Sequence, residues 1–216
     1  MRFHGFFRSS AAYRCRIAFN LKGLSPEAIS VHLRRGGGQQ KTEAFRALNP
    51  QALVPALETE GGAVLTQSLA ILEWLDETQP EPPFLPADPT ARARVRAFAL
   101  SIACDIHPLQ NLRVLQYLAG PLAQPQEAVD AWCRHWVADG LAACEGLLAQ
   151  AASPGPYAFG PIPGLADICL VPQVFSAQRF GVDLTPMPRV RAVAEACNAL
   201  PAFADAAPAR QPDFEA

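Results

Sequence analysis

The sequence predicts a two-part protein, in which a small mixed α/β domain precedes an all-helical bundle. Up to about residue 80, short alternating apolar runs are interleaved with short helical patterns, whereas every later pattern has helical periodicity. Between the two parts lie five prolines, at positions 80, 82, 83, 86 and 89, a density typical of a linker. We therefore expect one domain over residues 1–80, a linker over 81–89 and a helical domain over 90–216.

The composition limits the class of protein. With 216 residues, half of them hydrophobic and 18% charged, the chain can bury a core and is not disordered. A formal net charge of −2 favours neither nucleic acid nor an anionic membrane as a partner. No apolar run approaches the length of a membrane span. No signal peptide is apparent either, because Arg2, His4 and Arg8 interrupt the first apolar stretch.

The cysteines indicate a reducing compartment. The six are spread along the chain without a C-x-x-C pair or a histidine at metal-ligand spacing. Most lie within apolar helical patterns, which predicts buried, reduced thiols. We expect a cytoplasmic protein without a metal site.

The first domain opens with a strand–helix–strand unit. Residues 2–6 form a strand pattern, 13–21 an amphipathic helix and 28–33 a second strand. Such a unit should be parallel and right-handed. Arg14 and Arg16 fall outside the apolar stripe of the helix, so we expect them to project away from its packed face.

The rest of the first domain should contain a hairpin and a further helix. Residues 53–58 and 63–66 form its antiparallel strands, and Pro55 at the start is a candidate for a cis peptide bond. A helix over 69–75 follows, with Ser68 placed to cap it.

A glycine run links the second strand to a short helix. It reads R-R-G-G-G-Q-Q at 34–40 and precedes a helical pattern at 42–48. It lacks the G-K-[ST] ending of a phosphate loop and the G-x-G-x-x-G of a dinucleotide fold, so the sequence excludes both motifs.

The second half consists of helices. The patterns cover residues 91–118, with an irregularity at Pro108, then 126–151, 165–180 and 189–200. The apolar stripe of the second of these is typical of a core, not of a cofactor site.

Two strand-to-helix junctions carry polar side chains that suit an anion. Ser9 and Ser10 follow Arg8 at the first junction, and Gln67 and Ser68 stand at the second. A helix N-terminus presents unpaired N–H groups and a partial positive charge, so it can bind a thiolate or carboxylate. The alternative at each junction is an N-cap and nothing more.

Eight separated segments together resemble the zeta-class glutathione transferases, a family that includes maleylacetoacetate and maleylpyruvate isomerases. The resemblance implies an α/β thioredoxin-like N-terminal domain plus an all-α C-terminal helical bundle, the glutathione transferase fold. The segments are R-S-S-x-x-x-R at 8–14, G-G-G-Q-Q at 36–40, A-L-N-P-x-x-L-V-P at 47–55, Q-S-L-A-I-L-E-W-L at 67–75, I-H-P-L-Q-N-L at 106–112, A-D-I-C-L-V-P-Q-V at 166–174, R-F-G-V-D-L-T-P at 179–186 and R-Q-P-D at 210–213.

The resemblance implies glutathione as the cofactor, bound mainly by the first domain. Ser9 or Ser10 would hydrogen-bond its sulfur, and Gln67 with Ser68 would hold its γ-glutamyl carboxylate. The backbone of Val54, before Pro55, would pair with the cysteinyl residue of the tripeptide, and Gln40 would reach its glycyl end. From the helical domain, the implied contacts are Asp105, His107 and Asn111.

The implied reaction is a cis–trans isomerisation of a conjugated keto-diacid. A thiolate adds to the double bond, the resulting single bond rotates, and the thiolate leaves. This requires an activated thiol, donors for an enolate and cations for the substrate carboxylates. Serine activation is favoured over Tyr13, which lies a turn into the helix. The enolate donors are open among Ser10, backbone N–H groups and His107, and the expected cations are Arg8, Arg179 and Arg113.

The sequence departs from the family at two positions. Ala11 stands where many members have cysteine, so the site should work without a protein thiol there. Gly164 replaces a serine or threonine cap, which leaves Asp167 to accept backbone N–H bonds. The leading function is the isomerase, acting on maleylacetoacetate or maleylpyruvate. The alternatives are a transferase that conjugates small electrophiles or halogenated acids, and a non-catalytic binding protein. The family also implies a homodimer.

Overall fold

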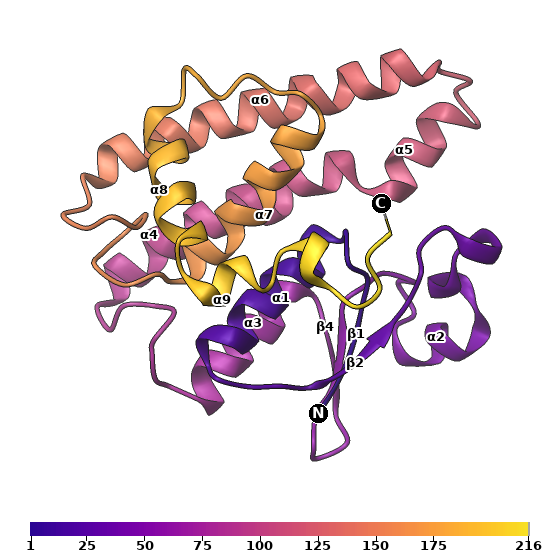
Figure 1. The fold of residues 1–216 in the computed structure, drawn as a ribbon, viewed down its shortest axis with the longest axis horizontal. Helices are drawn as coiled ribbons and strands as arrows, with labels where there is room; N and C mark the ends of the chain where they lie inside the picture. Colours follow the sequence, from indigo (N-terminus) through magenta and orange to yellow (C-terminus); the bar gives the residue numbers. More distant parts are fainter. Residues whose placement is uncertain (216) are drawn as a thin grey trace. The chain divides into compact units, whose positions relative to one another are not determined.

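The computed structural model describes residues 1–215 and divides the chain into two compact units. The first contains residues 1–83 together with the segment from Leu200 onward, and the second contains residues 84–199 (Figure 1). The helical domain expected over residues 90–216 includes this last segment. The segment groups with the first unit because its side chains and carbonyls bond to residues of the first 35, as described below.

A four-stranded sheet forms the centre of the first unit. The strands are β1 (Arg2–Gly5), β2 (Glu27–Ser30), β3 (Ala56–Glu58) and β4 (Val64–Thr66), in the order β2-β1-β3-β4. β1 pairs in parallel with β2 and antiparallel with β3, and β3 pairs antiparallel with β4. The predicted strand–helix–strand unit and hairpin are confirmed.

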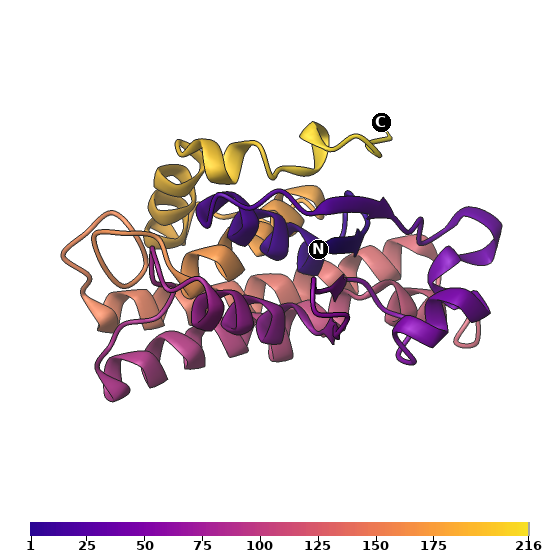
Figure 2. The ribbon, with the colours of Figure 1, turned by 90° about the horizontal axis from the view of Figure 1, so that it is seen from below.

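Helices of the first unit connect these strands. α1 (Ser10–Leu21) and α3 (Ser68–Thr78) pack side by side, while α2 (Glu43–Leu48) follows the 3-10 turns Arg35–Gly37 and Gln39–Lys41 (Figures 1 and 2). Their apolar faces and the sheet enclose a core, because such side chains gain roughly 1.5–3 kcal/mol each on full burial. Fully buried core residues include Ile17, Leu57, Ile71, Leu72 and Leu75.

Two expectations for α1 and α3 were wrong. Ser68 is the first helical residue of α3 and not its cap; that position belongs to Gln67. Arg14 does not project away from the packed face, because it is only 2% exposed, and Arg16 is half-buried. The spacing along one helix could not show that α3 and the C-terminal segment cover these positions.

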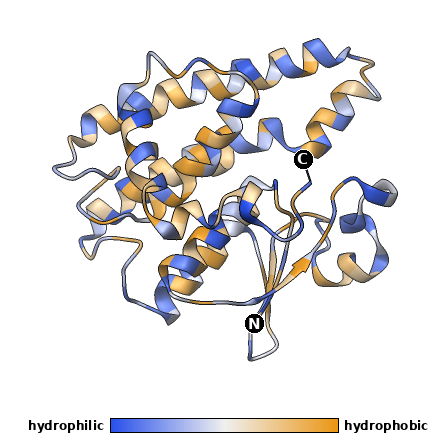
Figure 3. Cartoon of the chain, viewed as in Figure 1, coloured by the Kyte–Doolittle hydropathy of each residue, from blue (hydrophilic) through white to orange (hydrophobic). Residues whose placement is uncertain are grey.

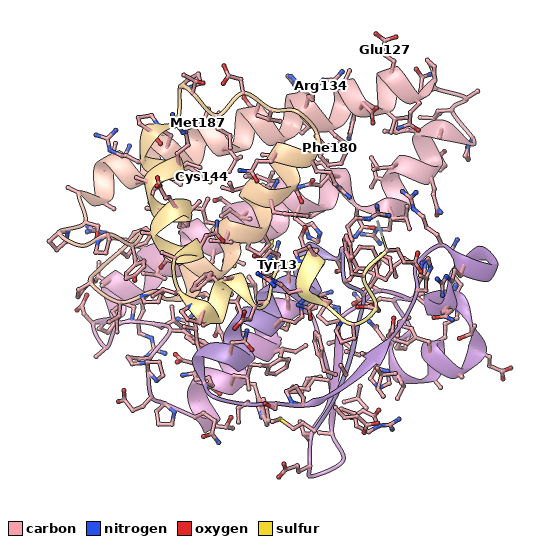
Figure 4. All side chains as sticks on the ribbon, viewed as in Figure 1. Tyr13, Glu127, Arg134, Cys144, Phe180 and Met187 are labelled. Atoms are coloured by element: carbon pink, nitrogen blue, oxygen red, sulfur yellow. The ribbon has the colours of Figure 1, made fainter. Side chains whose placement is uncertain are left out.

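The C-terminal segment runs along α1, and includes α9 (Pro201–Ala204) and the 3-10 turn Pro208–Arg210 (Figure 2). The Tyr13 hydroxyl, on the α1 residue labelled in Figure 4, donates to the Phe203 carbonyl at 3.4 Å. Arg16 Nε donates to the Ala206 carbonyl at 2.9 Å. Burial lowers the pKa of Arg16 to about 10, against the opposing effect of Asp213. These contacts fix the segment on α1.

The second unit is helical. It contains α4 (Pro89–Leu100), α5 (Leu112–Ala119), α6 (Gln126–Ala151), α7 (Leu165–Arg179) and α8 (Pro188–Asn198). The predicted single helix over 91–118 is wrong, because a π-helix (Ser101–Ile106) and a 3-10 turn (His107–Gln110) separate α4 from α5. Pro108 supplies no N–H donor to an α-helical ladder, which accounts for the break. Figure 3 shows the apolar residues that dominate α7.

Asp167 closes the start of α7 as predicted. Its carboxylate accepts the N–H groups of Gly164 and Ala158, both at 2.9 Å. Burial raises the pKa of Asp167, and the two N–H donors act against that shift. Asp167 thus binds the N–H of the cap residue Gly164 and ties Ala158 to the start of the helix, although Gly164 has no capping side chain of its own.

Five of the six cysteines are buried free thiols, as expected for most of them, whereas Cys104 on the π-helix is exposed. Among residues 1–215, no cluster of histidine, cysteine and acidic side chains has the arrangement of a metal site. No helix within the described part of the chain has the length and apolar character needed to cross a bilayer.

Candidate functional site

The sheet topology gathers the predicted residues of the first unit at one edge. His4 of β1, Ala56 of β3 and Thr66 of β4 lie opposite one another in register. β1 and β4 run antiparallel to β3, so the carboxyl ends of β1 and β4 meet the start of β3. The junctions at Ser9 and Gln67 and the approach to β3 at Val54 therefore share that edge.

Ser9 caps α1 and keeps a hydrogen-bond donor. It has the extended backbone of an N-cap (φ −69°, ψ 119°), and its Oγ accepts the Ala12 N–H at 3.2 Å. A serine hydroxyl has one proton and two acceptor positions, so the cap occupies an acceptor and leaves the proton. Ser10 is the first helical residue and is 9% exposed, whereas Ser9 is half-buried. Capping and binding of an anion are thus compatible at Ser9.

Arg8 places a cation beside this junction. Its guanidinium lies 5.6 Å from the centre of the Phe7 ring, and the residue is half-buried. Burial lowers the pKa of Arg8, as does the neighbouring Arg34, while Glu215 acts in the opposite direction. A cation that has lost part of its water attracts an anionic ligand more strongly than one in bulk solvent.

At the second junction, the N-terminus of α3 is open. Gln67 has φ +67°, which is uncommon for a residue other than glycine. Among residues 1–215 no side chain caps the helix, and its first N–H groups have no intrahelical acceptor. Gln67 Nε2 donates to Gln51 Oε1 at 2.8 Å, and Ser68 Oγ accepts from Arg14 Nη1 at 3.0 Å. Backbone in a sparsely populated conformation, as at Gln67, is found more often at functional sites than elsewhere.

Val54 presents an unpaired backbone at the start of β3. The Val54–Pro55 peptide bond is cis, as predicted. Within the described residues, neither the N–H nor the C=O of Val54 has a hydrogen-bond partner. Unpaired strand backbone is the feature by which a sheet binds an extended peptide.

The structure places Gln40 differently from the other predicted residues. Its side chain is 6% exposed and turns into its own loop, where Nε2 donates to the Leu33 carbonyl at 3.3 Å. Its Oε1 is buried without a partner among the described residues. The second N–H of Nε2 is the donor that remains for a ligand carboxylate.

The predicted residues of the second unit come from two places. Asp105 is exposed on the π-helix, and His107 is half-buried at the start of the next turn. Asn111 caps α5, with its Oδ1 accepting the N–H of the exposed Arg113 at 3.2 Å. All four thus lie within nine residues of chain.

Arg179 ends α7 and is exposed, with its guanidinium 4.5 Å from the centre of the Phe180 ring, a residue labelled in Figure 4. Burial raises the pKa of Cys133 on α6 to about 11, and the charge of Arg179 opposes this shift. Arg179 is therefore close enough to α6 to act on it electrostatically.

Three further residues of this region were missed by the sequence analysis. Gln51 bonds to Gln67, Arg14 to Ser68, and Asp213 to the backbone of Phe7. Gln51 lay within the A-L-N-P-x-x-L-V-P segment, at a position that the motif leaves open. Arg14 ends the R-S-S-x-x-x-R segment and Asp213 ends R-Q-P-D at 210–213, but neither segment assigned these residues a contact at the site.

The mixed sheet in the order β2-β1-β3-β4, the capped α1 and open α3 N-termini at its edge, and the helical second unit have the arrangement of the glutathione transferase fold. The glutathione S-transferase N-terminal domain family matches residues 8–78. The chain is 53% identical to a maleylpyruvate isomerase from a Ralstonia species over 213 residues, or 99% of each chain. On these grounds the chain belongs to the zeta-class glutathione transferases, the family of the maleylacetoacetate and maleylpyruvate isomerases.

Solved structures agree over the full length. A holo maleylpyruvate isomerase, described as a bacterial zeta-class enzyme, has a TM-score of 0.95 at 51% identity, with 100% of both chains covered. A maleylacetoacetate isomerase from Methylobacterium extorquens AM1, with bound malonate and glutathione, has a TM-score of 0.95 at 40% identity, also with 100% of both chains covered.

Proposed function

We propose that this protein is a glutathione-dependent isomerase that converts a maleyl keto-diacid into its fumaryl form. The observation that carries the proposal is the shared sheet edge, where an activating helix N-terminus, an unpaired strand backbone and a second open helix N-terminus meet. A tripeptide thiol has a thiol for the first helix N-terminus, a peptide backbone for the strand and a terminal carboxylate for the second helix N-terminus. The relatives support this reading by their own activities and ligands.

Glutathione would bind along that edge. The backbone of Val54, ahead of Pro55, pairs with the cysteinyl residue in the manner of an added strand. Gln67, Ser68 and the N–H groups of α3 hold the γ-glutamyl carboxylate, which the helix dipole also favours. Gln40 serves the glycyl end with its remaining N–H. Asp105, His107 and Asn111 are the contacts proposed from the helical unit.

Ser9 would activate the glutathione thiol. Its hydroxyl proton is left over from the capping bond and can donate to the sulfur. This donation and the positive end of α1 both favour the thiolate, so the pKa of the bound thiol falls below the free value of about 8.5. Ser10, which is more buried, supports the same junction. Ala11 contributes no thiol, so the only sulfur nucleophile in this scheme is that of glutathione.

The thiolate attacks one alkene carbon of the substrate and forms a C–S bond. The π electrons move onto the conjugated carbonyl oxygen as an enolate, which Ser10, backbone N–H groups or His107 stabilise. The former double bond rotates as a single bond. The enolate then re-forms the double bond in the trans geometry and expels the thiolate, so glutathione is regenerated.

The substrate is a small diacid, and its two carboxylates require cations. Arg8 adjoins Ser9 and is the first candidate, with Arg179 as the second and Arg113 as the third. Arginine suits the task because its planar guanidinium binds a carboxylate through two parallel hydrogen bonds.

The decisive assay follows the ultraviolet absorbance of maleylpyruvate, and separately of maleylacetoacetate, with and without glutathione. We expect conversion that depends on glutathione and leaves its concentration unchanged. Stoichiometric consumption of the thiol would instead identify the conjugating transferase, and binding without turnover would identify a non-catalytic protein. The diacid that is converted with the higher kcat/KM is the substrate.

We further propose a homodimer in the reducing cytoplasm. The family supports the dimer, and the free thiol state of all six cysteines is consistent with that compartment. Sedimentation equilibrium should give twice the chain mass of 23.2 kDa.

A further inference from the structure

Arg14 is a buried positive charge at the N-terminus of α3. Its side chain is 2% exposed, and its Nη1 donates to Ser68 Oγ at 3.0 Å. Nε and Nη2 are buried without a hydrogen-bond partner among residues 1–215. No described carboxylate forms an ion pair with Arg14 either. Since arginine keeps its charge in proteins, the free protein holds an uncompensated buried cation here.

The bond from Arg14 also fixes the role of the Ser68 hydroxyl. A hydroxyl oxygen has two acceptor positions and a single proton. Because the guanidinium fills one acceptor position, the proton points away from Arg14 and is available as a donor. The first N–H groups of α3 are open beside it. The result is a set of donors backed by a cation, which suits a carboxylate.

We propose that Arg14 is a positioning residue for the γ-glutamyl carboxylate of glutathione. It orients the Ser68 hydroxyl toward that carboxylate and provides its counter-charge from behind, without touching the ligand. This inference rests on the proposed function, which assigns the carboxylate to Gln67 and Ser68. The specificity that follows is for thiol peptides whose γ-glutamyl residue keeps its free α-carboxylate.

The test compares two ligands by titration calorimetry: glutathione and γ-aminobutyryl-cysteinyl-glycine, which lacks only that carboxylate. The wild-type protein should bind glutathione at least tenfold more tightly than the analogue. In Arg14→Met and in Arg14→Gln this ratio should fall to below about threefold, because binding of glutathione weakens while binding of the analogue is nearly unchanged. Ser68→Ala should reduce this affinity ratio similarly. The double variant Ser68→Ala/Arg14→Met should have nearly the same ratio as Ser68→Ala.

Arg16→Met is the matched control. It removes a second inward-facing arginine of α1, whose partners are backbone carbonyls, including that of Ala206. We expect lower stability but the wild-type ligand ratio. If Arg14 were purely structural, its variants would also keep the wild-type ligand ratio. A wild-type ratio in folded Arg14→Met or Arg14→Gln therefore overturns the proposal for Arg14 but leaves the proposed function standing.

The remaining outcomes are also decisive. Since an unpaired buried charge is costly, both neutral variants should fold at least as stably as the wild-type protein in the absence of ligand. Failure of both to fold contradicts this and overturns the proposal. If the wild-type protein does not bind glutathione at all, the proposed function fails, and the assignment of Arg14 fails with it.

Discussion

The carboxylate of Asp213 accepts the backbone N–H of Phe7 at 3.1 Å, and so joins the end of the chain to the loop that carries Ser9. The same Oδ2 atom accepts the hydroxyl of Ser30, the last residue of β2, at 2.8 Å. Next to it, the Phe214 ring packs edge-on against Phe7 with 5.5 Å between ring centres. The C-terminal segment thus holds the first strand-to-helix junction in place.

Asp213→Ala should therefore impair both folding and turnover. Loss of the acceptor for a backbone N–H and a hydroxyl should lower the free energy of unfolding by about 1–3 kcal/mol. Displacement of the Ser9 loop should lower kcat/KM about tenfold. Urea denaturation and the isomerase assay measure the two effects.

Two controls accompany this variant. Asp213→Asn keeps an acceptor oxygen, so its free energy of unfolding and its kcat/KM should lie between those of wild type and Asp213→Ala. Glu215→Ala removes the exposed ion pairs to His32 and Arg35 and should cost below about 1 kcal/mol. Wild-type kcat/KM in Asp213→Ala would show that the junction does not depend on the C-terminal segment.

Arg8→Ala should act mainly on charged substrates. We expect kcat/KM for the maleyl diacid to fall about ten- to a hundredfold, because a charge-assisted hydrogen bond to a carboxylate is lost. A neutral electrophile conjugated by the same site should lose less than about threefold. Arg34→Ala, which removes the neighbouring exposed cation, is the control for bulk charge. Equal losses on both substrates would argue against a carboxylate clamp at Arg8.

Glu58 should govern part of the stability at acid pH. Its pKa is lowered from the ordinary 4.5, mainly by the hydrogen bond with His4 and further by the charge of Arg2. Burial acts in the opposite direction and raises the pKa. A lowered native pKa gives stability that is present above pH 4.5 and lost as pH falls through the native value.

Glu58→Gln should consequently flatten the pH dependence of the free energy of unfolding between about pH 5 and pH 3. Denaturant melts across this range measure it. Isomerase activity of the folded variant at neutral pH should remain within about twofold of wild type. If the free energy of unfolding of Glu58→Gln depended on pH in this range as it does in wild type, the Glu58–His4 bond would contribute nothing to folding.

The local signals in the sequence were sufficient for one part of the site. The hydroxyls at Ser9 and Ser10 lie between a strand pattern and a helix pattern, and Pro55 marks the start of a strand by its chemistry alone. Asp167 could be assigned to the start of α7 because a capping carboxylate lies three residues from the cap. In each case the interacting groups are neighbours along the chain.

Contacts between distant residues could not be predicted in this way. Arg14 and Ser68 are 54 positions apart, and Phe7 and Asp213 are 206 apart. The helical periodicity of α1 places Arg14 outside the apolar stripe, which predicts a side chain that projects away from the packed face. Only the packing of α3 against α1 shows that the position is buried. The break at the π-helix was marked by Pro108, but its extent depends on backbone hydrogen bonds that no residue pattern specifies.

The activation of the glutathione thiol by Ser9 is the central claim. Ser9→Ala removes the hydroxyl and also the N-cap, at a cost of about 1 kcal/mol. Ser9→Gly removes the same hydroxyl but costs only a few tenths of a kcal/mol in capping. Ser9→Thr retains the hydroxyl. The three variants therefore separate thiol activation from helix capping.

Spectroscopic titration of the thiolate in the bound complex is the most direct test. In wild type and Ser9→Thr, we predict a pKa of bound glutathione clearly below the free value of about 8.5. In Ser9→Ala and Ser9→Gly alike, it should rise toward that value, and isomerisation should fall with it. A wild-type titration curve in Ser9→Gly would contradict the account.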